Sequence, residues 1–399
     1  MMNSGPFLLI IGPLLGGLTA VLLQRWARLT AVSGAVASGA LWLALRLSSG
    51  SQWPLFGVSF VLTDEGRALF QGLLLLLGLL FVLALRWPPG RHALPACLAA
   101  VSPLAAMVMV RPLTLGALFL VLAAVLLAVG AANGAAVAAA NGAAGVRSAM
   151  AAWRYLMMAL LALPMLLLVG WLADAPGALP LGAARVLAVA SIILVGGFPF
   201  MLWVRPTARQ AGPLLRPFLF GGAPLVVMAF LFSWLQVRPD WQADPGFQTW
   251  LRWSGLMTAV LGGLLAATAA DWDDLLVSLL LLDVGAGLLV LLLPGALGWQ
   301  TAVSIHVGRA AGLLLAGVGR LGVWRRPLAV GLMAYGCLTL LGLPLTLGFN
   351  GRWALLAGLP GQNGGGVAVG LLLLAQAAGL WGVAHWAWRI GRSADSSAP

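Results

Sequence analysis

The sequence predicts an all-α polytopic membrane protein, because the chain is long, strongly apolar and poor in charge. Of its 399 residues, 62% are hydrophobic and only 8% are charged, whereas soluble domains carry about 25% charged residues. This composition excludes a soluble globular protein, a disordered chain and a nucleic-acid-binding module. The 52 glycines follow no three-residue period, which excludes collagen. Each membrane span needs about 20 residues, so the length allows roughly a dozen spans.

The apolar runs predict about thirteen transmembrane helices in chain order. The first run, at 6–24, has no basic segment before it, so we interpret it as a span rather than a cleavable signal. Further spans are predicted at about 29–47, 66–86, 92–110, 112–131, 149–173, 182–204, 214–236, 249–270, 274–294, 299–319, 327–350 and 365–389. The segment 390–399 is polar, and we expect it to be a disordered tail.

The charges are a signal of topology. All 22 basic residues are arginine, and the net charge is +12. Loops on one side hold Arg25, Arg28, Arg86, Arg91, Arg147, Arg205, Arg209, Arg320, Arg325, Arg326, Arg389 and Arg392. Loops on the other side hold chiefly Arg46, Arg111, Arg185 and Arg238. The positive-inside rule therefore predicts the N-terminus outside and the C-terminus in the cytoplasm. The membrane that we expect is a bacterial inner membrane.

Two short segments about 145 residues apart resemble each other. Each is a Gly-x-Pro interruption of an apolar run, centred on Pro199 and on Pro344. Proline removes a backbone donor and clashes with the preceding turn, so both positions predict broken helices. Paired broken helices are typical of inverted-repeat transporters. The alternative is a pair of unrelated proline kinks.

Ionisable residues inside predicted spans are the best functional candidates, because their burial in hydrocarbon is costly. They are Asp283, His306, Arg309 and Arg352. His306 and Arg309 are three positions apart and share one helix face. One interpretation is a polar proton or ion pathway at the bilayer midplane. The alternative is that Asp283 and Arg309 form a structural ion pair, with Arg352 extending to the interface.

The remaining candidate sites are weaker. The carboxylates of Asp271, Asp273 and Asp274 lie at a helix start, where they complement the positive end of the helix dipole. Cys97 and Cys337 lie in apolar runs without metal-binding spacing, so we expect no metal site and no cofactor. No Ser-His-Asp set, phosphate loop or catalytic carboxylate pair stands out. The chain is therefore not predicted to be an enzyme with a catalytic site of its own.

Several segments, taken in order, resemble the antiporter-like membrane subunits of respiratory complex I and of Mrp-type cation/proton antiporters. The segments are SFVLTDEGRALFQGLLLLLGLL, VGGFPFMLWVRPTARQAGP, WDDLLVSLLLLDVGAGLL, IHVGRAAGLLLAG and LTLLGLPLTLGFNGRWALLAG. The last one is similar to the family's Gly-x-Pro-x-x-x-Gly-Phe-x-Gly-Lys signature and is the most specific. The likeness extends over roughly residues 55 to 360.

The resemblance implies a fold of about fourteen helices with two inverted five-helix repeats, broken near Pro199 and Pro344. The domains are then N-terminal transmembrane helices at 1–110, a first antiporter-like repeat at 111–236, and a second repeat with the last helix at 249–389. The final helix of the family is missing from this sequence. The resemblance also implies a central polar axis along which protons move.

This sequence departs from the family along that axis. Where the resemblance implies an acidic residue and two lysines, the chain has Leu120, Leu194 and Pro224. Two further lysine positions hold Arg309 and Arg352, a histidine position holds Asp283, and a basic pair reads Asp273-Asp274. Lysine loads and releases protons because burial lowers its pKa readily. Arginine stays protonated and is a poor proton carrier.

These observations predict a diverged antiporter-like subunit of a complex-I-like, NADH:quinone oxidoreductase-type assembly, with impaired or no proton pumping of its own. Its expected partners are other membrane subunits and lipid, with no nucleic acid, and any quinone bound elsewhere in the complex. One alternative is an independent secondary transporter with an arginine-lined site for an anion or acidic solute. Another is a membrane scaffold that conducts nothing.

Overall fold

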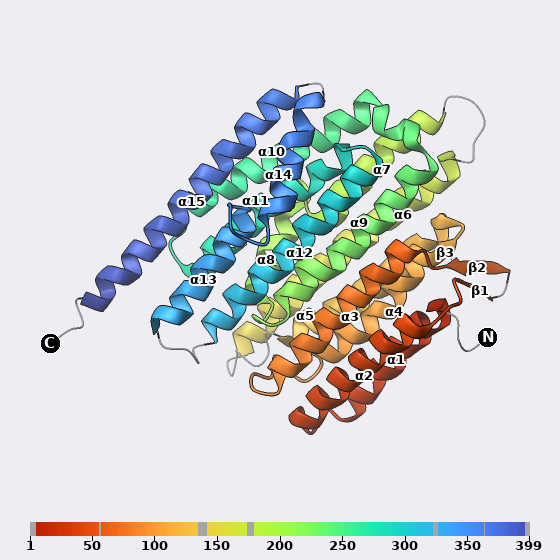
Figure 1. Ribbon diagram of the computed structural model, residues 1–399, viewed down its shortest axis with the longest axis horizontal. Helices are drawn as coiled ribbons and strands as arrows, with labels where there is room; N and C mark the ends of the chain where they lie inside the picture. Colours follow the sequence, from red (N-terminus) through yellow and green to blue (C-terminus); the bar gives the residue numbers. More distant parts are fainter. Residues whose placement is uncertain are drawn as a thin grey trace.

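The computed structural model describes residues 5–55, 57–134, 142–173, 179–321, 326–362 and 364–395. Within these ranges the chain is a bundle of helices with one small β sheet (Figure 1). The first helices are α1 (Gly5–Leu22), α2 (Ala27–Leu47), α3 (Asp64–Ala84), α4 (Ala93–Met109), α5 (Gly116–Gly134) and α6 (Gly142–Ala173). They are followed by α7 (Leu179–Val195), α8 (Val204–Gln210), α9 (Ala223–Val237), α10 (Pro245–Ala267), α11 (Trp272–Leu289), α12 (Gly295–Arg320), α13 (Arg326–Leu341), α14 (Phe349–Gly358) and α15 (Gly365–Asp395).

Short 3-10 and π segments extend or connect several helices. The 3-10 segments are η1 (Leu113–Leu115), η3 (Phe200–Trp203), η5 (Pro239–Ala243), η6 (Val290–Leu292) and η7 (Leu359–Gly361). The segment η4 (Phe218–Gly222) is π-helical and leads directly into α9.

The all-α polytopic class is confirmed. Ten helical segments of the described chain are long and apolar enough to cross a membrane. Two shorter apolar helices, Ala93–Met109 and Pro327–Leu341, accompany them. The predicted spans and the observed helices agree to within a few residues in most cases; the span predicted at 29–47, for example, is α2. Hydropathy predicts such helices well because a chain in hydrocarbon must satisfy its backbone hydrogen bonds internally.

The helix starts follow from side chains that accept hydrogen bonds from free backbone amides. The Thr63 hydroxyl accepts from the Gly66 amide at 3.1 Å at the start of α3. Asp244, followed by Pro245, accepts from the Phe247 amide at 2.8 Å at the start of α10. Capping residues of these types satisfy amides that the first helical turn leaves without partners.

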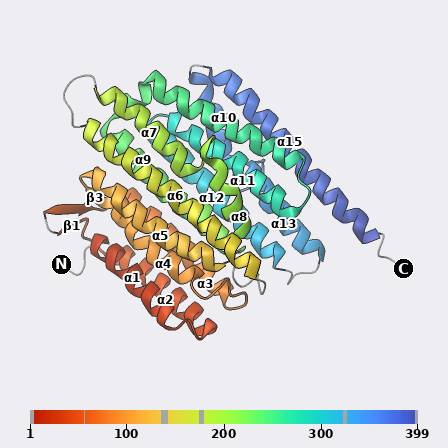
Figure 2. The same ribbon diagram turned by 180° about the vertical axis from the view of Figure 1, so that it is seen from behind.

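Helix α11 lies at the centre of the second half of the chain. All residues from Leu275 to Leu289 are buried, and the helix contacts α10, α12, α13 and α15. A helix that is apolar all round is expected to be surrounded by protein. Figures 1 and 2 show α1–α5 gathered on one flank of the molecule and α15 on the opposite flank. The only acidic side chain within the buried run of α11 is Asp283, which therefore reaches the molecular centre.

The two predicted interruptions are present. Helix α7 ends at Val195, Pro199 lies in the turn that follows, and the chain continues through η3 into α8. Helix α13 ends at Leu341, Pro344 lies in the next turn, and α14 begins at Phe349. Glycines with positive φ, Gly196 at 83° and Gly342 at 68°, directly follow the two helix ends.

Two features differ from the sequence predictions. The chain contains a three-stranded antiparallel sheet of β1 (Gln52–Leu55), β2 (Val58–Val61) and β3 (Val110–Arg111). Strands of four residues or fewer are too short to show a clear alternating pattern. Helix α15 continues to Asp395, so residues 390–395 are not the predicted disordered tail. Extending an existing helix adds one hydrogen bond per residue, and this favours continuation into a polar segment. Residues 396–399 lie outside the described ranges.

The arrangement of the helices agrees with the two groups of arginine-bearing loops. The turn between α1 and α2 and the turn between α3 and α4 lie at the end of the bundle opposite the sheet, as does the end of α15 (Figure 1). Of the loop arginines assigned to this end, Arg147, Arg325, Arg326 and Arg392 have side chains outside the described part of the structure.

Candidate functional site

Three of the four predicted intramembrane residues form one ion-pair cluster. Asp283 accepts hydrogen bonds from two arginines: Nε of Arg309 lies 2.5 Å from Oδ2, and Nη2 of Arg352 lies 2.7 Å from Oδ1. All three side chains are at least 94% buried. The cluster joins the consecutive helices α11 and α12 to α14, which follows two elements later in the chain. The ion pair expected as an alternative between Asp283 and Arg309 is therefore present, and Arg352 does not extend to the interface.

Backbone carbonyls complete the surroundings of both arginines. Nη2 of Arg309 donates to the Asp283 carbonyl at 3.0 Å, and Nη1 donates to the Phe220 carbonyl at 3.3 Å. Phe220 belongs to the π-helical segment η4, where the usual α-helical hydrogen-bond pattern is interrupted. Nη2 of Arg352 donates to the Leu340 carbonyl at 3.2 Å. Leu340 lies in the last turn of α13, whose carbonyls lack helical partners because the helix stops.

The cluster carries one positive charge in excess. Two guanidinium groups face one carboxylate, and Nε and Nη1 of Arg352 have no hydrogen-bond partner among the described residues. The C-terminal end of α13, where Leu340 accepts from Arg352, provides a negative helix-dipole end that offsets part of this charge. Buried ion pairs resist rearrangement because separating either partner leaves an uncompensated charge in a low-dielectric interior. The arrangement therefore holds the side chain of Asp283 in a fixed position between the two arginines.

Glycines create the space for the two guanidinium groups. A Cβ atom on Gly287 would lie 2.9 Å from Nη2 of Arg309. A Cβ atom on Gly342 would lie 2.6 Å from Cβ of Arg352, and the positive φ of Gly342 also disfavours other residues. Helix α12 also crosses the second break closely, since a Cβ on Gly308 would lie 2.7 Å from Cα of Gly348. These contacts fix both arginines relative to α11.

His306 lies near the cluster but outside it. The ring is fully buried, and Nδ1 is 2.9 Å from the Ala302 carbonyl of its own helix. Nε2 has no hydrogen-bond partner among the described residues. A Cβ on Gly287 would lie 3.7 Å from Cε1 of His306, so Gly287 borders both His306 and Arg309. The shared helix face predicted for His306 and Arg309 therefore turns towards α11, but only Arg309 reaches Asp283.

The first break, by contrast, is held by hydroxyl groups. The Phe198 amide donates to Oγ1 of Thr258 at 2.7 Å, and Oγ of Ser254 donates to the Phe198 carbonyl at 2.7 Å. Ser254 and Thr258 lie one turn apart on α10 and are buried. Sequence reasoning missed both, although the four-residue spacing of two hydroxyls in an apolar helix is a signal that could have identified them. No charged side chain approaches Pro199 among the contacts of the described residues.

The positions where the resemblance implied titratable residues are apolar. Leu120 is buried in α5 and packs in the hydrophobic core. Leu194 lies in the last turn of α7, directly before the first break, and Pro224 lies in the first turn of α9. Hydrocarbon side chains and proline rings neither load nor release protons. Among the positions compared with the family, the buried charged residues are therefore Asp283, Arg309 and Arg352, in the second half of the chain.

A second group of charges lies at the start of α11. Asp274 pairs with Arg205 at 2.6 Å and with Arg209, while Asp273 pairs with Arg216 at 3.1 Å and Arg320 at 2.5 Å. The carboxyl group of Asp271 accepts from the Asp274 amide at 2.7 Å, as a capping residue does. Capping thus explains Asp271. Asp273 and Asp274 mainly join α11 to α8, to α12 and to the helical residue Arg216 just before η4. The sequence could not show which arginines would reach them.

The comparisons with known proteins bear on the fold. No protein-family model matches the sequence, and no curated protein matches it either. Solved structures do match. A chain of an archaeal respiratory membrane complex, the membrane-bound sulfane sulfur reductase, aligns with a TM-score of 0.72 and 16% identity, covering 94% of this chain and 86% of its own length.

Two further structures match over the same extent of this chain. A chain of the Mrp complex from Dietzia sp. DQ12-45-1b has a TM-score of 0.73 and 17% identity; the alignment covers 94% of this chain and 46% of that one. A chain of respiratory complex I from Thermus thermophilus has a TM-score of 0.71 and 19% identity; the alignment covers 94% of this chain and 87% of that one. The expected resemblance is thereby confirmed at the level of the fold: this chain shares its fold with chains of the Mrp complex and of two respiratory membrane complexes.

Proposed function

We propose that this chain is a diverged antiporter-like membrane subunit of a complex-I-like, NADH:quinone oxidoreductase-type assembly, and that it does not pump protons itself. The observation that carries this proposal is the clamping of Asp283 between Arg309 and Arg352. A proton carrier must change its charge during turnover, whereas arginine stays protonated and is a poor proton carrier. In this assembly the cluster stabilises the second half of the chain.

The rest of the pathway supports the same proposal. Leu120, Leu194 and Pro224 place hydrocarbon where the resemblance implies titratable groups. Quinone and electron chemistry are assigned, in this proposal, to other subunits of the assembly. We propose that it lies in a bacterial inner membrane, with its N-terminus outside and its C-terminus in the cytoplasm, because arginines concentrate in the loops at one end.

Copurification tests the assembly. The full chain, carrying an affinity tag, is purified from native membranes in mild detergent, and the associated chains are identified by mass spectrometry. We expect other membrane subunits of a quinone-linked redox complex. Recovery of the chain alone as a stable transporting monomer would overturn the proposal.

The absence of pumping is tested in the same membranes. The ratio of protons translocated to electrons transferred is measured with a fluorescent pH probe for the wild type and for His306→Ala. His306 has the unpartnered Nε2 and is the best remaining proton carrier in the second half. We expect an unchanged ratio in assemblies of equal abundance. A reduced ratio with normal electron transfer would show that this subunit conducts protons.

One observation favours a second candidate, a secondary transporter for an anion or acidic solute. Nε and Nη1 of Arg352 have no partner among the described residues and offer hydrogen bonds to an anion. Against it, Asp283 already neutralises one of the two guanidinium charges and would repel an anion at the same place. Anion uptake into proteoliposomes that contain only this chain, abolished by Arg352→Gln, would favour the transporter.

A further inference from the structure

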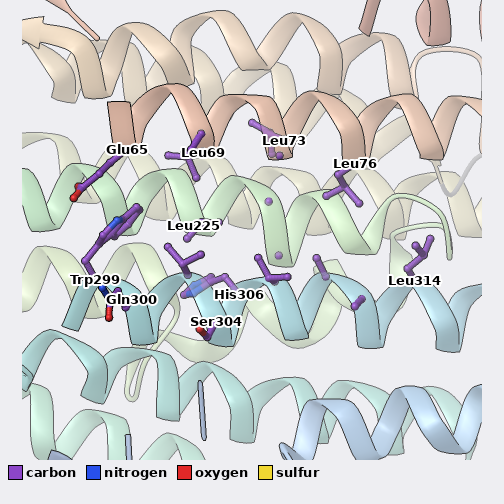
Figure 3. A pocket seen from close by; sticks show the side chains of 18 residues that line it. Glu65, Leu69, Leu73, Leu76, Leu225, Trp299, Gln300, Ser304, His306 and Leu314 are labelled. Carbon is purple, nitrogen blue, oxygen red and sulfur yellow. The ribbon is translucent and has the colours of Figure 1, made fainter. Parts of the chain in front are cut away.

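A long groove separates α3 from α12 at the junction of the two halves of the chain. Its volume is about 670 Å³, and its floor is formed by Gly221, Gly222 and Leu225, at the start of α9. Figure 3 shows side chains of α3 and α12 facing each other across it. Most of the lining is apolar, with Leu69, Leu73, Leu76, Val303, Val307 and Leu314 among its residues. An apolar space of this size lies within the usual range of ligand pockets, about 300–1,000 Å³.

The groove runs along the helices rather than across them. Trp299 and Leu314 line its two ends on α12 (Figure 3), and this stretch of helix is about 22 Å long at 1.5 Å per residue. Glu65 and Trp299 lie together at one end, close to the N-terminal ends of α3 and α12. One leaflet of a membrane contributes about 15 Å of hydrocarbon. The groove is therefore long enough to match the hydrocarbon depth of one leaflet.

The length and the apolar lining of the groove suit a hydrocarbon chain. Ala68, Gly72 and Ala310 carry little or no side chain and so leave room between the larger apolar residues of the walls. A single acyl chain can lie in this space.

A small polar cavity continues the groove at its surface end. It measures about 70 Å³ and shares Glu65, Leu69 and Trp299 with the groove. Thr63, Arg111, Ser233 and Gln236 complete its polar lining. An apolar channel that ends in a polar compartment is complementary to an amphipathic ligand. The apolar chain of such a ligand would lie in the groove and its headgroup in the small cavity.

Arg111 and Glu65 identify the headgroup chemistry. Nη1 of Arg111 donates to the carbonyls of Val108 and Val110, at 3.1 and 2.9 Å, and no carboxylate pairs with it among the described residues. Burial lowers the pKa of Arg111, and no acidic group opposes this shift. Glu65, the only glutamate of the sequence, likewise has no ion pair among the described residues. A phosphate would complement Arg111, and an ammonium group would complement Glu65.

We propose that the groove between α3 and α12 binds one aminophospholipid. One acyl chain lies between Leu69 and Leu314, the phosphate contacts Arg111, and the primary amine faces Glu65. A free fatty acid fits less well, because its carboxylate would lie beside that of Glu65. The bound lipid fills the junction between the two halves of the chain on the side opposite the arginine-rich loops.

Photolabelling in membranes that contain the full chain tests this site. The probe is an aminophospholipid with a photoreactive group on one acyl chain, and labelled peptides are identified by mass spectrometry. The variant Gly72→Leu blocks the groove without a clash, since a Cβ at Gly72 meets no atom within 4 Å. We expect labelling of α3 and α12 to fall by about tenfold, since the chain loses its apolar contacts. Gly39→Leu on α2 is the matched control, because Gly39 is equally open, and it should label as the wild type does.

The headgroup is tested with a second probe, a diacylglycerol that carries the same photoreactive chain. We expect the wild type and Arg111→Lys to prefer the phospholipid, and Arg111→Gln to lose that preference. Three outcomes would overturn the proposal. They are equal groove labelling in Gly72→Leu and wild type, no preference between the two probes in the wild type, and crosslinks in the intact assembly to a partner protein instead of lipid.

Discussion

At the scale of single residues, Asp283 is held by two arginine partners in the protein interior. Each of its two carboxyl oxygens accepts a hydrogen bond from a different arginine, so both oxygens are already paired. In a membrane interior the alternative to pairing is an isolated guanidinium, which is strongly disfavoured. The role of Asp283 is therefore structural in the first place.

We predict that Asp283→Asn destabilises the protein by about 3–5 kcal/mol, because it leaves two buried guanidiniums without a counter-ion. Thermal unfolding of the purified assembly, followed by the loss of this chain from it, measures the effect. Asp240→Asn is the control, since Asp240 is half-exposed and pairs with Arg238 at the surface. An exposed pair is worth about 0–1 kcal/mol. Equal stability of the two variants would contradict a structural role for the cluster.

We also predict that Arg309→Lys reduces the yield of the assembly less than Arg309→Ala does. Lysine keeps the charge opposite Asp283 but cannot reproduce the contacts of Arg309 with both the Asp283 and Phe220 carbonyls. Alanine removes the charge altogether. The measurement is the amount of assembled complex per unit of membrane protein. Equal yields for the two variants would show that Arg309 has no charge-dependent partner.

A further prediction concerns the close packing of Gly287 against Arg309 rather than the charge of the cluster. A methyl group at this position would lie 2.9 Å from Nη2 of Arg309, so Gly287→Ala should displace the guanidinium and lower the unfolding temperature. Gly331→Ala on α13 is the control, because a Cβ there meets no atom within 4 Å. Alanine is the better helix former, by about 1 kcal/mol, so the control should be neutral or stabilising. A stabilised Gly287→Ala would rule out the close approach.

At the scale of elements, the two breaks use different chemistry to satisfy their backbone. Hydroxyls of Ser254 and Thr258 bond the first break, and the second relies on Arg352, Gln376 and Tyr335, which donate to its carbonyls. Backbone groups freed at membrane depth need such partners, because lipid offers none. Both breaks are thus maintained by neighbouring helices, and only one of them contains charge.

The first break can be tested with a substitution that keeps the shape of the side chain. Thr258→Val removes the acceptor of the Phe198 amide, and an unsatisfied buried amide costs about 1–3 kcal/mol. Thr268→Val provides the control, because the hydroxyl of Thr268 is exposed at the end of α10. Hydrogen exchange at the Phe198 amide should accelerate in the first variant only. Unchanged exchange would mean that Thr258 does not hold this turn.

The sequence predicted the elements better than their interactions. Proline with neighbouring glycine marked both breaks, since these residues restrict the backbone whatever lies around them. The hydroxyl partners on α10 and the carbonyl of Phe220 in the π segment were not predicted. Their roles depend on which helices become neighbours, and no local pattern encodes that.

Across the whole molecule, charge pairs at the arginine-rich end connect helices that are remote in the sequence. Asp273 is shared by Arg216, which lies two residues before η4, and Arg320 from the end of α12. Arg216 is itself buried, so it depends on this carboxylate. These pairs hold α11 in place at one end, and the Asp283 cluster holds it at its centre.

We predict that Asp273→Asn lowers the stability of the protein by about 1–3 kcal/mol, because buried Arg216 loses its carboxylate partner. Asp64→Asn is a matched control in the first turn of α3, where no ion pair is formed among the described residues. Both variants lose the same favourable interaction with a helix dipole, worth about 0.3–1 kcal/mol. A similar decrease in the unfolding temperature of both variants would show that the stabilising effect of Asp273 comes from the helix dipole alone.

The sequence by itself determined the membrane-embedded class, the positions of most helices and the sites of the two breaks. These features depend on the apolar content and backbone restrictions of continuous segments, which are local properties. Only the tertiary structure decided that Arg309 and Arg352, 26 and 69 positions from Asp283, share its carboxylate, and that a groove lies between α3 and α12. Helix packing brings these residues together, and the free energy of each pair or cavity arises only once distant segments are in contact.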